Sequence, residues 1–536
     1  MTEMLNNPKP VADPARAERA AEWWFAALAT LAVLALHLYF LNRVGGLWRD
    51  EVNSVNLAQG EWRNLTHDSF PILFPLLLRG WNELGLGSTD LTIRSFGVLM
   101  GLLLTVTFWI SARWTRSAPP LWSITLVALN AWVIYYAASV RAYGLGSALI
   151  AFCAAAAWRF IQQPDKKTWL LFTLTAMLSV QTLYQNSALV AAICAGAGAV
   201  AWRQKKFKLI VAIFCAGLVA ALSLLPYWIN ITGMAAGAAP LRMDFDSFTA
   251  RLQLNTLLAF PLPQFYWLWP LLIGGVLLRA IGGIFSKNPD DRSLFSAVMI
   301  LVGAVAFWFF LFHANFPVQP WYFLPPVALA AVGLELALPR PAGKFRALLF
   351  GGLAALAIIS GIFGVRVLDY RFTNVDQFAK KISGAARTND FVVVTPWQFG
   401  ITFARYFHGP CAWESVPPLG DHTAHRFDLI QIQMKNPEAM SPVLAKISTT
   451  LQAGSAVWIV GEINDVGGTN APGVPPPPPL PRTGWHETPY RFAWNNQLGW
   501  LLHRHATNLE CLDRGFAEDV NFNERSPLFK VTGWKN

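Results

Sequence analysis

The fold is decided by residues 22–53, which read EWWFAALATLAVLALHLYFLNRVGGLWRDEVN, a long apolar run followed by the acidic pair Asp50-Glu51. Two adjacent carboxylates at the mouth of a membrane-spanning segment are unfavourable, because a charge near hydrocarbon loses its hydration. A site that needs a general base or a cation ligand gives a reason to keep them there. The alternative reading is a pair of solvated acids in a surface loop, and spacing alone does not separate the two.

The composition places the chain among membrane proteins. Of its 536 residues, 54% are hydrophobic and only 14% are charged, and a helix needs about 20 consecutive apolar residues to cross a bilayer. Such runs recur along the chain, which predicts a polytopic α-helical membrane domain over residues 21–366. We expect about eleven spans, at 22–42, 92–112, 121–138, 142–161, 168–184, 186–202, 209–229, 264–281, 293–313, 321–338 and 347–366.

The placement of lysine and arginine predicts the orientation of these spans, because cytoplasmic loops are enriched in both residues. With residues 1–20 as a cytoplasmic leader, every loop expected inside is basic, and an odd number of spans places residues 367–536 outside. The leader has no convincing small-residue cleavage site, so the first segment is predicted to be a retained span. The membrane that we expect is a bacterial-style inner membrane. The inside loops contain Arg113, Arg116, Lys166, Lys167, Arg203, Lys205, Lys206, Lys208, Lys287, Arg292, Arg340, Lys344 and Arg346, whereas Arg43, Arg49, Arg63 and Arg79 in the first outer loop run against the rule.

The net charge of +11 requires no nucleic acid partner. Much of it is topological lysine and arginine, and no helix-turn-helix pattern or basic-aromatic RNA motif occurs. Zinc has no support in the sequence, since neither CxxC nor HExxH is present. Three cysteines fall within predicted spans, while Cys411 and Cys511 fall in the tail, where an oxidising compartment would allow a disulfide.

Two regions outside the spans have patterns of their own. In the first outer loop, residues 43–91, the stretch 70–81 is too apolar for free solution and too short to span, which predicts an amphipathic segment in the interface plane. The tail, residues 367–536, alternates helix-like and strand-like stretches and is predicted to form an extracytoplasmic α/β domain. In that domain we expect helices at 375–387, 438–453 and 498–504, and buried strands at 390–395 and 455–460.

Several short motifs follow one another in an order typical of one family. The acidic pair is followed by Asp68-Ser69-Phe70-Pro71-Ile72-Leu73 and Gly87-Ser88-Thr89-Asp90-Leu91-Thr92-Ile93-Arg94. Farther on come Tyr135-Tyr136-Ala137-Ala138-Ser139-Val140-Arg141-Ala142-Tyr143 and Pro320-Trp321-Tyr322-Phe323-Leu324-Pro325. This order, over roughly residues 20–370, resembles the polytopic glycosyltransferases of the GT-C fold, and most of all family 39, the protein O-mannosyltransferase and aminoarabinose transferase relatives.

The chain also departs from the family pattern. Where the family has Asp-x-His-Pro-Pro-Leu, the histidine is Phe70 and the second proline is Ile72 here. In the Tyr-Ser-x-Glu-x-Arg-x-Tyr element the glutamate is Ser139, and the arginine of the later Arg-Tyr-Leu-x-Pro element is Trp321. The resemblance therefore carries over neither a substrate nor a metal ligand at these four positions.

The resemblance implies transfer of a sugar from a polyprenyl-phosphate donor to a lipid, glycan or protein acceptor on the outer side, usually with inversion. Such a displacement needs a base for the acceptor hydroxyl and positive charge on the departing phosphate. On this basis Asp50 is the expected base, with Glu51 positioning it or the acceptor. Arg141 and, second to it, Arg94 are the expected phosphate ligands. Substrate-binding candidates are Asp68, Tyr143, Trp321 and Tyr322; no metal ligand is assigned, although the family leaves room for a divalent cation.

Each of these residues also has a purely structural reading. Arg141 can be a snorkelling residue at headgroup depth, Arg94 an interfacial anchor, and Asp68 a helix cap, while Trp321 and Tyr322 are typical of the aromatic belt. Two other function classes stay open: a transporter or flippase for a lipid-linked sugar, and a non-catalytic membrane assembly protein. A transporter is disfavoured because its charges would lie near the midplane, whereas those of this chain cluster at span ends.

Overall fold

The computed structural model describes most of the chain. The described ranges are 14–62, 70–228, 267–286, 290–314, 318–340, 343–464, 472–478, 486–515 and 519–535. Asp68, one of the predicted substrate-binding residues, lies outside them.

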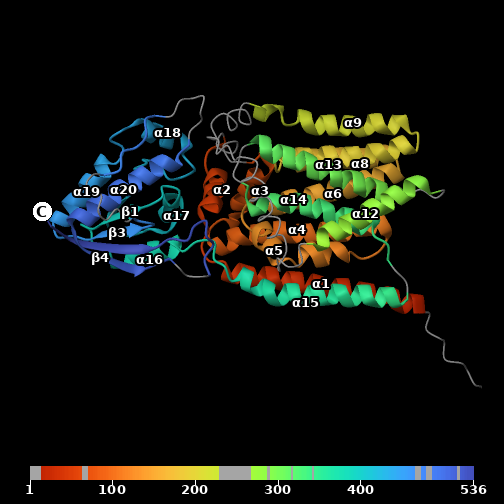
Figure 1. Cartoon of the computed structure of the whole chain (residues 1–536), viewed down its shortest axis with the longest axis horizontal. Coiled ribbons are helices and arrows are strands. Elements are labelled where there is room, and N and C mark those ends of the chain that lie inside the picture. The colour runs from red at the N-terminus through yellow and green to blue at the C-terminus, as the bar shows by residue number, and fades with distance from the viewer. Residues whose placement is uncertain are drawn as a thin grey trace, which may run out of the picture.

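Long apolar helices make up the first part of the chain and run side by side in a bundle (Figure 1). Seven helices among the described residues are long and apolar enough to cross a membrane. Large hydrophobic side chains such as Phe214, Leu348 and Ile362 are exposed on the outside of the bundle, as expected for surfaces that face lipid. The chain is therefore an integral membrane protein. The bundle contains α1 (Pro14–Arg43), α4 (Asp90–Arg116), α6 (Tyr143–Gln162), α7 (Lys166–Val180), α8 (Asn186–Arg203), α9 (Phe207–Leu222), α12 (Leu268–Phe285), α13 (Asp291–Ala314), α14 (Leu324–Ala337) and α15 (Lys344–Leu368).

Each of the eleven predicted segments contains a helix, but four of them are shorter or less apolar in the described structure than a spanning helix requires. One prediction is wrong in detail: residues 121–138 do not form one continuous helix. They form a π-helical turn, η3 (Ile124–Ala128), and then α5 (Ala131–Ala137). Asn130 causes the break, because its side chain accepts a hydrogen bond from the N–H of Trp132 at 3.0 Å and so caps a new helix.

The first outer loop is itself largely helical. It begins with α2 (Arg49–Gln59) and continues with α3 (Leu73–Trp81) and the π-helical turn η2 (Asn82–Leu86). As predicted, the apolar stretch forms an amphipathic helix: Phe74 and Leu78, one turn apart, are buried, while the opposite face is exposed.

The tail folds into a five-stranded mixed sheet of order β2-β1-β3-β5-β4. Strands β2, β1 and β3 run parallel to one another, and β5 is antiparallel to both of its neighbours, β3 and β4. The two strands predicted from their apolar runs are confirmed as β1 and β3. The strands are β1 (Phe391–Val394), β2 (Ala412–Ser415), β3 (Val457–Val460), β4 (Ala506–Asp513) and β5 (Leu528–Trp534).

Helices cover both faces of this sheet, because alternate residues of a strand point to opposite sides. Phe391 and Val393 of β1 pack with one group of helices, and Val392 and Val394 pack with the other. The first group is α18 (Phe427–Lys435), α19 (Ser441–Gln452) and α20 (Thr488–His505), and the second is α16 (Val375–Ala385) and α17 (Phe399–Tyr406). The three predicted helices of the tail correspond to α16, α19 and part of α20. Cys411 and Cys511 are both free, so the disulfide that the sequence allowed is not formed.

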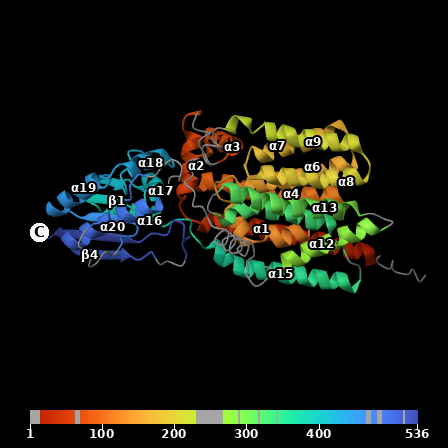
Figure 2. The same ribbon diagram turned by 45° about the horizontal axis from the view of Figure 1, so that its top comes forward.

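The bundle and the sheet lie at opposite ends of the molecule, and α2 and α17 lie where they meet (Figure 1; Figure 2 shows the same separation). Tyr406 of α17 links the two parts: its hydroxyl accepts from the N–H of Leu47 at 2.7 Å and donates to Asp90 at 2.6 Å. Arg405 forms an ion pair with the same Asp90 at 2.8 Å. The start of α4 and the loop before α2 are thus both fastened to the tail.

Candidate active site

The acidic pair Asp50-Glu51 lies in the first turn of α2. Carboxylates favour this position because they oppose the positive end of the helix dipole. Adjacent positions of a helix point about 100° apart, and the two side chains accordingly have different surroundings. Glu51 is fully buried, whereas Asp50 is 21% exposed.

Glu51 forms a buried ion pair with Arg94 of α4. Two nitrogens of the guanidinium donate to the two carboxylate oxygens at 2.9 Å each, and the Arg94 side chain is only 1% exposed. Burial raises the pKa of Glu51, and the positive charge of Arg94 opposes that rise. The pair has further backbone partners: Glu51 accepts from the N–H groups of Val140 and Trp48 at 2.9 and 3.3 Å, and Arg94 donates to the carbonyl oxygens of Gly45 and Gly46 at 3.2 and 2.6 Å.

This ion pair holds three segments of the chain together. The loop before α2 contacts the pair through the carbonyl oxygens of Gly45 and Gly46, and the turn before α6 contacts it through the N–H of Val140. The helix α4 supplies Arg94 itself. All three nitrogens of Arg94 and both oxygens of Glu51 are engaged inside the protein. The structure therefore places Arg94, a predicted phosphate ligand, in a buried structural contact.

Asp50 faces positive charge. Its Oδ1 lies 3.3 Å from Nε2 of His425 and 3.5 Å from Nε of Arg49. Burial by itself raises the pKa of Asp50, but the hydrogen bond with His425 and the charges of Arg141 and Arg49 outweigh burial and hold the pKa well below its usual range. The carboxylate is ionised at neutral pH.

Arg141 lies beside Asp50 in the short turn between α5 and α6. Its Nη1 donates to the backbone oxygen of Asp50 at 3.0 Å and to the hydroxyl of Ser54 at 2.7 Å. The guanidinium lies over the ring of Phe70, 4.3 Å from its centroid, in a cation–π contact. Phe70 thus supports the arginine, and Arg141 is 5% exposed.

Aromatic side chains continue from this point along one side of the site. Tyr143 lies edge-on to Phe70 at 5.4 Å, and both Trp321 and Tyr322 lie 6.2 Å from Tyr143. Trp321 and Tyr143 are buried, and Tyr322 is half-buried. Three of the four predicted substrate-binding residues therefore come together next to Arg141.

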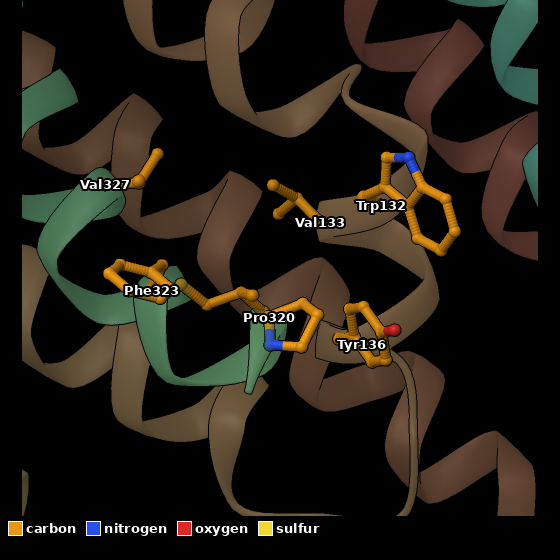
Figure 3. A pocket seen from close by; sticks show the side chains of 7 residues that line it. Trp132, Val133, Tyr136, Pro320, Phe323 and Val327 are labelled. Atoms are coloured by element: carbon orange, nitrogen blue, oxygen red, sulfur yellow. The ribbon is translucent and has the colours of Figure 1, made fainter. Parts of the chain in front are cut away.

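A small apolar pocket adjoins this aromatic group, since Tyr136, which lines it, lies 5.2 Å from Trp321. Figure 3 shows that its side chains come from α5 on one side, and from the 3-10 turn η6 (Pro320–Phe323) and the start of α14 on the other. The lining consists of Trp132, Val133, Tyr136, Pro320, Phe323, Leu324 and Val327. No charged residue belongs to this lining.

No protein-family model matches the sequence, and no curated protein matches it. Solved structures do. The chain is similar to ArnT from Cupriavidus metallidurans bound to undecaprenyl phosphate, with 13% identity and a TM-score of 0.47, over 82% of this chain and 93% of that chain. It is also similar to the archaeal oligosaccharyltransferase AglB from Archaeoglobus fulgidus in complex with an inhibitory peptide and a dolichol-phosphate, with 9% identity and a TM-score of 0.47, over 82% and 70% of the two chains.

The apo form of the Archaeoglobus fulgidus oligosaccharyltransferase matches with a TM-score of 0.50 at 11% identity, over 82% of this chain and 69% of that chain. The chain has the GT-C fold. At so low an identity the likeness concerns the fold alone. The fold predicted from the order of the motifs is thereby confirmed, and the roles of individual residues have to be argued from the geometry.

Within this GT-C fold the tail supplies a residue that the sequence reading missed. His425 reaches Asp50 from the loop before α18. The sequence carries one signal for it, the cluster Asp421-His422-Thr423-Ala424-His425, in which two histidines follow closely on an aspartate. Other tail residues with reactive or aromatic side chains lie elsewhere: His408 is exposed, and Trp413 packs on Phe403 at 5.1 Å.

The site offers little to a divalent cation. Such an ion takes several oxygen ligands, but Glu51 is occupied by Arg94, and Asp50 lies among Arg49, Arg141 and His425. Among the described residues, no group of three or more His, Cys, Asp or Glu side chains is placed to hold a metal ion. The described residues around Asp50 therefore do not fit a divalent cation.

Proposed function

We propose that the protein is a membrane glycosyltransferase that moves a sugar from a polyprenyl-phosphate donor to a lipid, glycan or protein acceptor at the outer face of the membrane. The GT-C fold supports the class of enzyme. One observation carries the assignment of the site: the ionised Asp50 lies beside Arg141 at the end of the bundle that faces the tail.

In the proposed reaction an acceptor hydroxyl attacks the anomeric carbon of the sugar from the side opposite the phosphate. The new bond forms between that carbon and the acceptor oxygen, while the bond to the phosphate oxygen breaks and the phosphate keeps the electron pair. Asp50 takes the proton of the hydroxyl, and Arg141 stabilises the charge on the departing phosphate. The configuration at the anomeric carbon inverts. Arg94 and Glu51 hold α2 in place through their buried ion pair, and on this proposal Arg141 alone contacts the phosphate.

The electrostatics of the site link donor binding to the strength of the base. A carboxylate with a strongly lowered pKa accepts a proton poorly, and Arg141 is one of the charges that lowers the pKa of Asp50. A lipid phosphate paired with Arg141 would cancel much of that charge. The pKa of Asp50 would then rise toward the range in which a general base works well. On this proposal the base becomes effective when the donor is present.

The apolar surroundings fit the rest of such a donor. Tyr143, Trp321 and Tyr322 provide flat rings against which a sugar can stack. The small pocket between α5 and residues 320–327 is lined by apolar side chains, and its rim suits contact with the isoprenoid chain beyond the phosphate. The aromatic residues next to Arg141 and the apolar surface beyond them thus offer contacts for the sugar and for the lipid of such a donor.

For the whole chain we propose about eleven membrane crossings, with residues 1–20 cytoplasmic and the domain 367–536 outside, in the inner membrane of a bacterium. Seven crossings would give the same sidedness, because both numbers are odd. The proposed membrane domain, residues 21–366, includes the catalytic first outer loop, 43–91. The outer domain would help to select the acceptor.

The test is turnover by the purified protein in lipid nanodiscs, with a panel of radiolabelled undecaprenyl-phosphate hexoses and pentoses and a membrane extract as acceptor. Asp50→Asn removes the base and keeps the shape, so we expect turnover to fall by about 10²–10⁴-fold while undecaprenyl phosphate still binds. The matched control is Glu83→Gln, an acid of the same loop that is 61% exposed, and it should keep full turnover.

Equal turnover of Asp50→Asn and the wild type would remove Asp50 as the base. If the wild type binds the lipid but moves it across the bilayer without breaking the sugar–phosphate bond, the protein is a transporter. If it neither binds nor converts any donor of the panel, the non-catalytic assembly role is favoured.

A further inference from the structure

One loop of the tail, residues 418–427, lies along α2. The N–H of His425 donates to the side chain of Asn53 at 2.9 Å, and the side chain of Asn56 donates to the carbonyl oxygen of Thr423 at 2.8 Å. Together with Asp50, these two asparagines are spaced three residues apart, which places them along one face of the helix. The tail therefore contacts the same face of α2 that carries the carboxylate of Asp50.

The imidazole of His425 is fixed from several sides. Its ring stands edge-on to Trp397 at 6.1 Å and stacks near Phe427 at 5.8 Å, and its side chain is 18% exposed. Nε2 lies 3.3 Å from Oδ1 of Asp50, whereas Nδ1 has no hydrogen-bond partner among the described residues. The hydrogen bond from the backbone N–H of His425 to Asn53 fixes the position of the imidazole ring along the axis of α2. The nitrogen that meets the carboxylate is thus placed by the packing of the tail.

We propose that His425 is a positioning residue of the transferase: it donates from Nε2–H to Oδ1 of Asp50 and so leaves Oδ2 directed at the acceptor hydroxyl. This inference rests on the proposed function, because it assigns a role relative to the proposed base. A carboxylate on a single rotatable bond can turn, and a donor held on one oxygen restricts it to one orientation. A misplacement of about 1 Å at a reacting group can lower a rate by about 10²-fold.

It follows that the active site is complete only when the outer domain is docked on α2. The bundle supplies the base and the arginine, and the tail supplies the group that orients the base. The histidine takes no proton from the substrate. It changes the reaction through Asp50 alone.

The experiment compares His425→Phe, which keeps a ring of similar shape without the donor, with His425→Gln, whose amide N–H can reach the position of Nε2. We expect His425→Phe to lower kcat by about 10- to 100-fold, with the Kd for undecaprenyl phosphate and the thermal unfolding midpoint unchanged. His425→Gln should restore most of kcat. The matched control is His422→Phe on the same loop, since His422 packs on Trp413 at 4.6 Å and should keep full turnover.

Several results would overturn the inference. If His425→Phe keeps kcat while Asp50→Asn loses it, the proposed transferase stands and His425 has no positioning role. If His425→Phe and His425→Gln lose kcat equally, or lose it in step with the unfolding midpoint, the histidine acts only in packing. Failure of Asp50→Asn to lower turnover would instead refute the proposed base, so the two failures are distinguishable.

Discussion

Glu524 is a carboxyl group that the fold buries completely although it carries no proposed catalytic role. Its oxygens accept from the N–H of Arg49 at 3.0 Å and from the hydroxyl of Thr402 at 2.5 Å. Burial raises the pKa of Glu524 to about 8, and the charge of Arg49 only partly opposes that rise. A residue of the tail thereby caps the first N–H of α2, next to Asp50.

The raised pKa makes a prediction about stability. The folded chain keeps the proton of Glu524 up to about pH 8, while the unfolded chain loses it near the ordinary value of 4.5. Between these values the folded state binds more protons, so its stability falls as pH rises, by about 1.4 kcal/mol per pH unit from this group. Glu524→Gln should remove that fall, so its unfolding midpoint should match the wild type near pH 4.5 and exceed it increasingly toward pH 8.

Thermal unfolding of the purified full chain across this pH range measures the difference. The control Glu438→Gln changes an exposed acid of the same domain and should follow the wild type at every pH. A difference between Glu524→Gln and the wild type that does not vary with pH would contradict the assignment of the buried proton to Glu524.

At the scale of elements, α2 is fixed from both sides. The bundle holds it through the buried pair of Glu51 and Arg94, and the tail holds it through its contacts with Asn53 and Asn56. Val52, Val55 and Ala58 of the helix are also buried in the core of the bundle. Because apolar packing is non-directional, the polar contacts are what set the orientation of α2.

We expect Glu51→Gln to destabilise the protein by about 3–5 kcal/mol, because it leaves the buried guanidinium of Arg94 without its counter-charge. Glu83→Gln removes an exposed ion pair with Arg79 and should cost less than about 1 kcal/mol. Thermal unfolding of both variants at one pH, in the same detergent, compares them. Similar midpoints for the two would show that the pair of Glu51 and Arg94 is not what holds α2.

At the scale of the whole molecule, a hydrophobic bundle ends in a polar domain that lies on one side of the proposed membrane. Cys511 in β4 is exposed on that domain, whereas Cys411 is buried. A membrane-impermeant maleimide should therefore label Cys511 in right-side-out vesicles and leave it unlabelled in inside-out vesicles. Cys511→Ser should abolish the label. Labelling only in inside-out vesicles would reverse the proposed orientation.

Much of the bundle could be predicted because a spanning helix requires about 20 consecutive apolar residues, which are visible in the sequence. Two strands of the tail could be predicted from equally local signals, since β1 and β3 are short apolar runs bounded by polar residues. The break at Asn130 was missed, because a window average over 121–138 hides one capping residue. Within the site, the contact of Phe70 with Arg141 and the arrival of His425 could not be predicted, since both depend on residues far apart in the chain.

Local sequence is enough to predict the membrane bundle, the α/β tail and an acidic pair in the first outer loop, because each follows from the composition of neighbouring residues. The roles of the two carboxylates, in contrast, depend on the fold. It buries Glu51 against Arg94 and exposes Asp50 to Arg141 and His425, although the two acids are adjacent. The physical reason is that the charge state and the role of a carboxylate depend on the groups within a few ångströms, and the fold brings those groups from four separate parts of the chain.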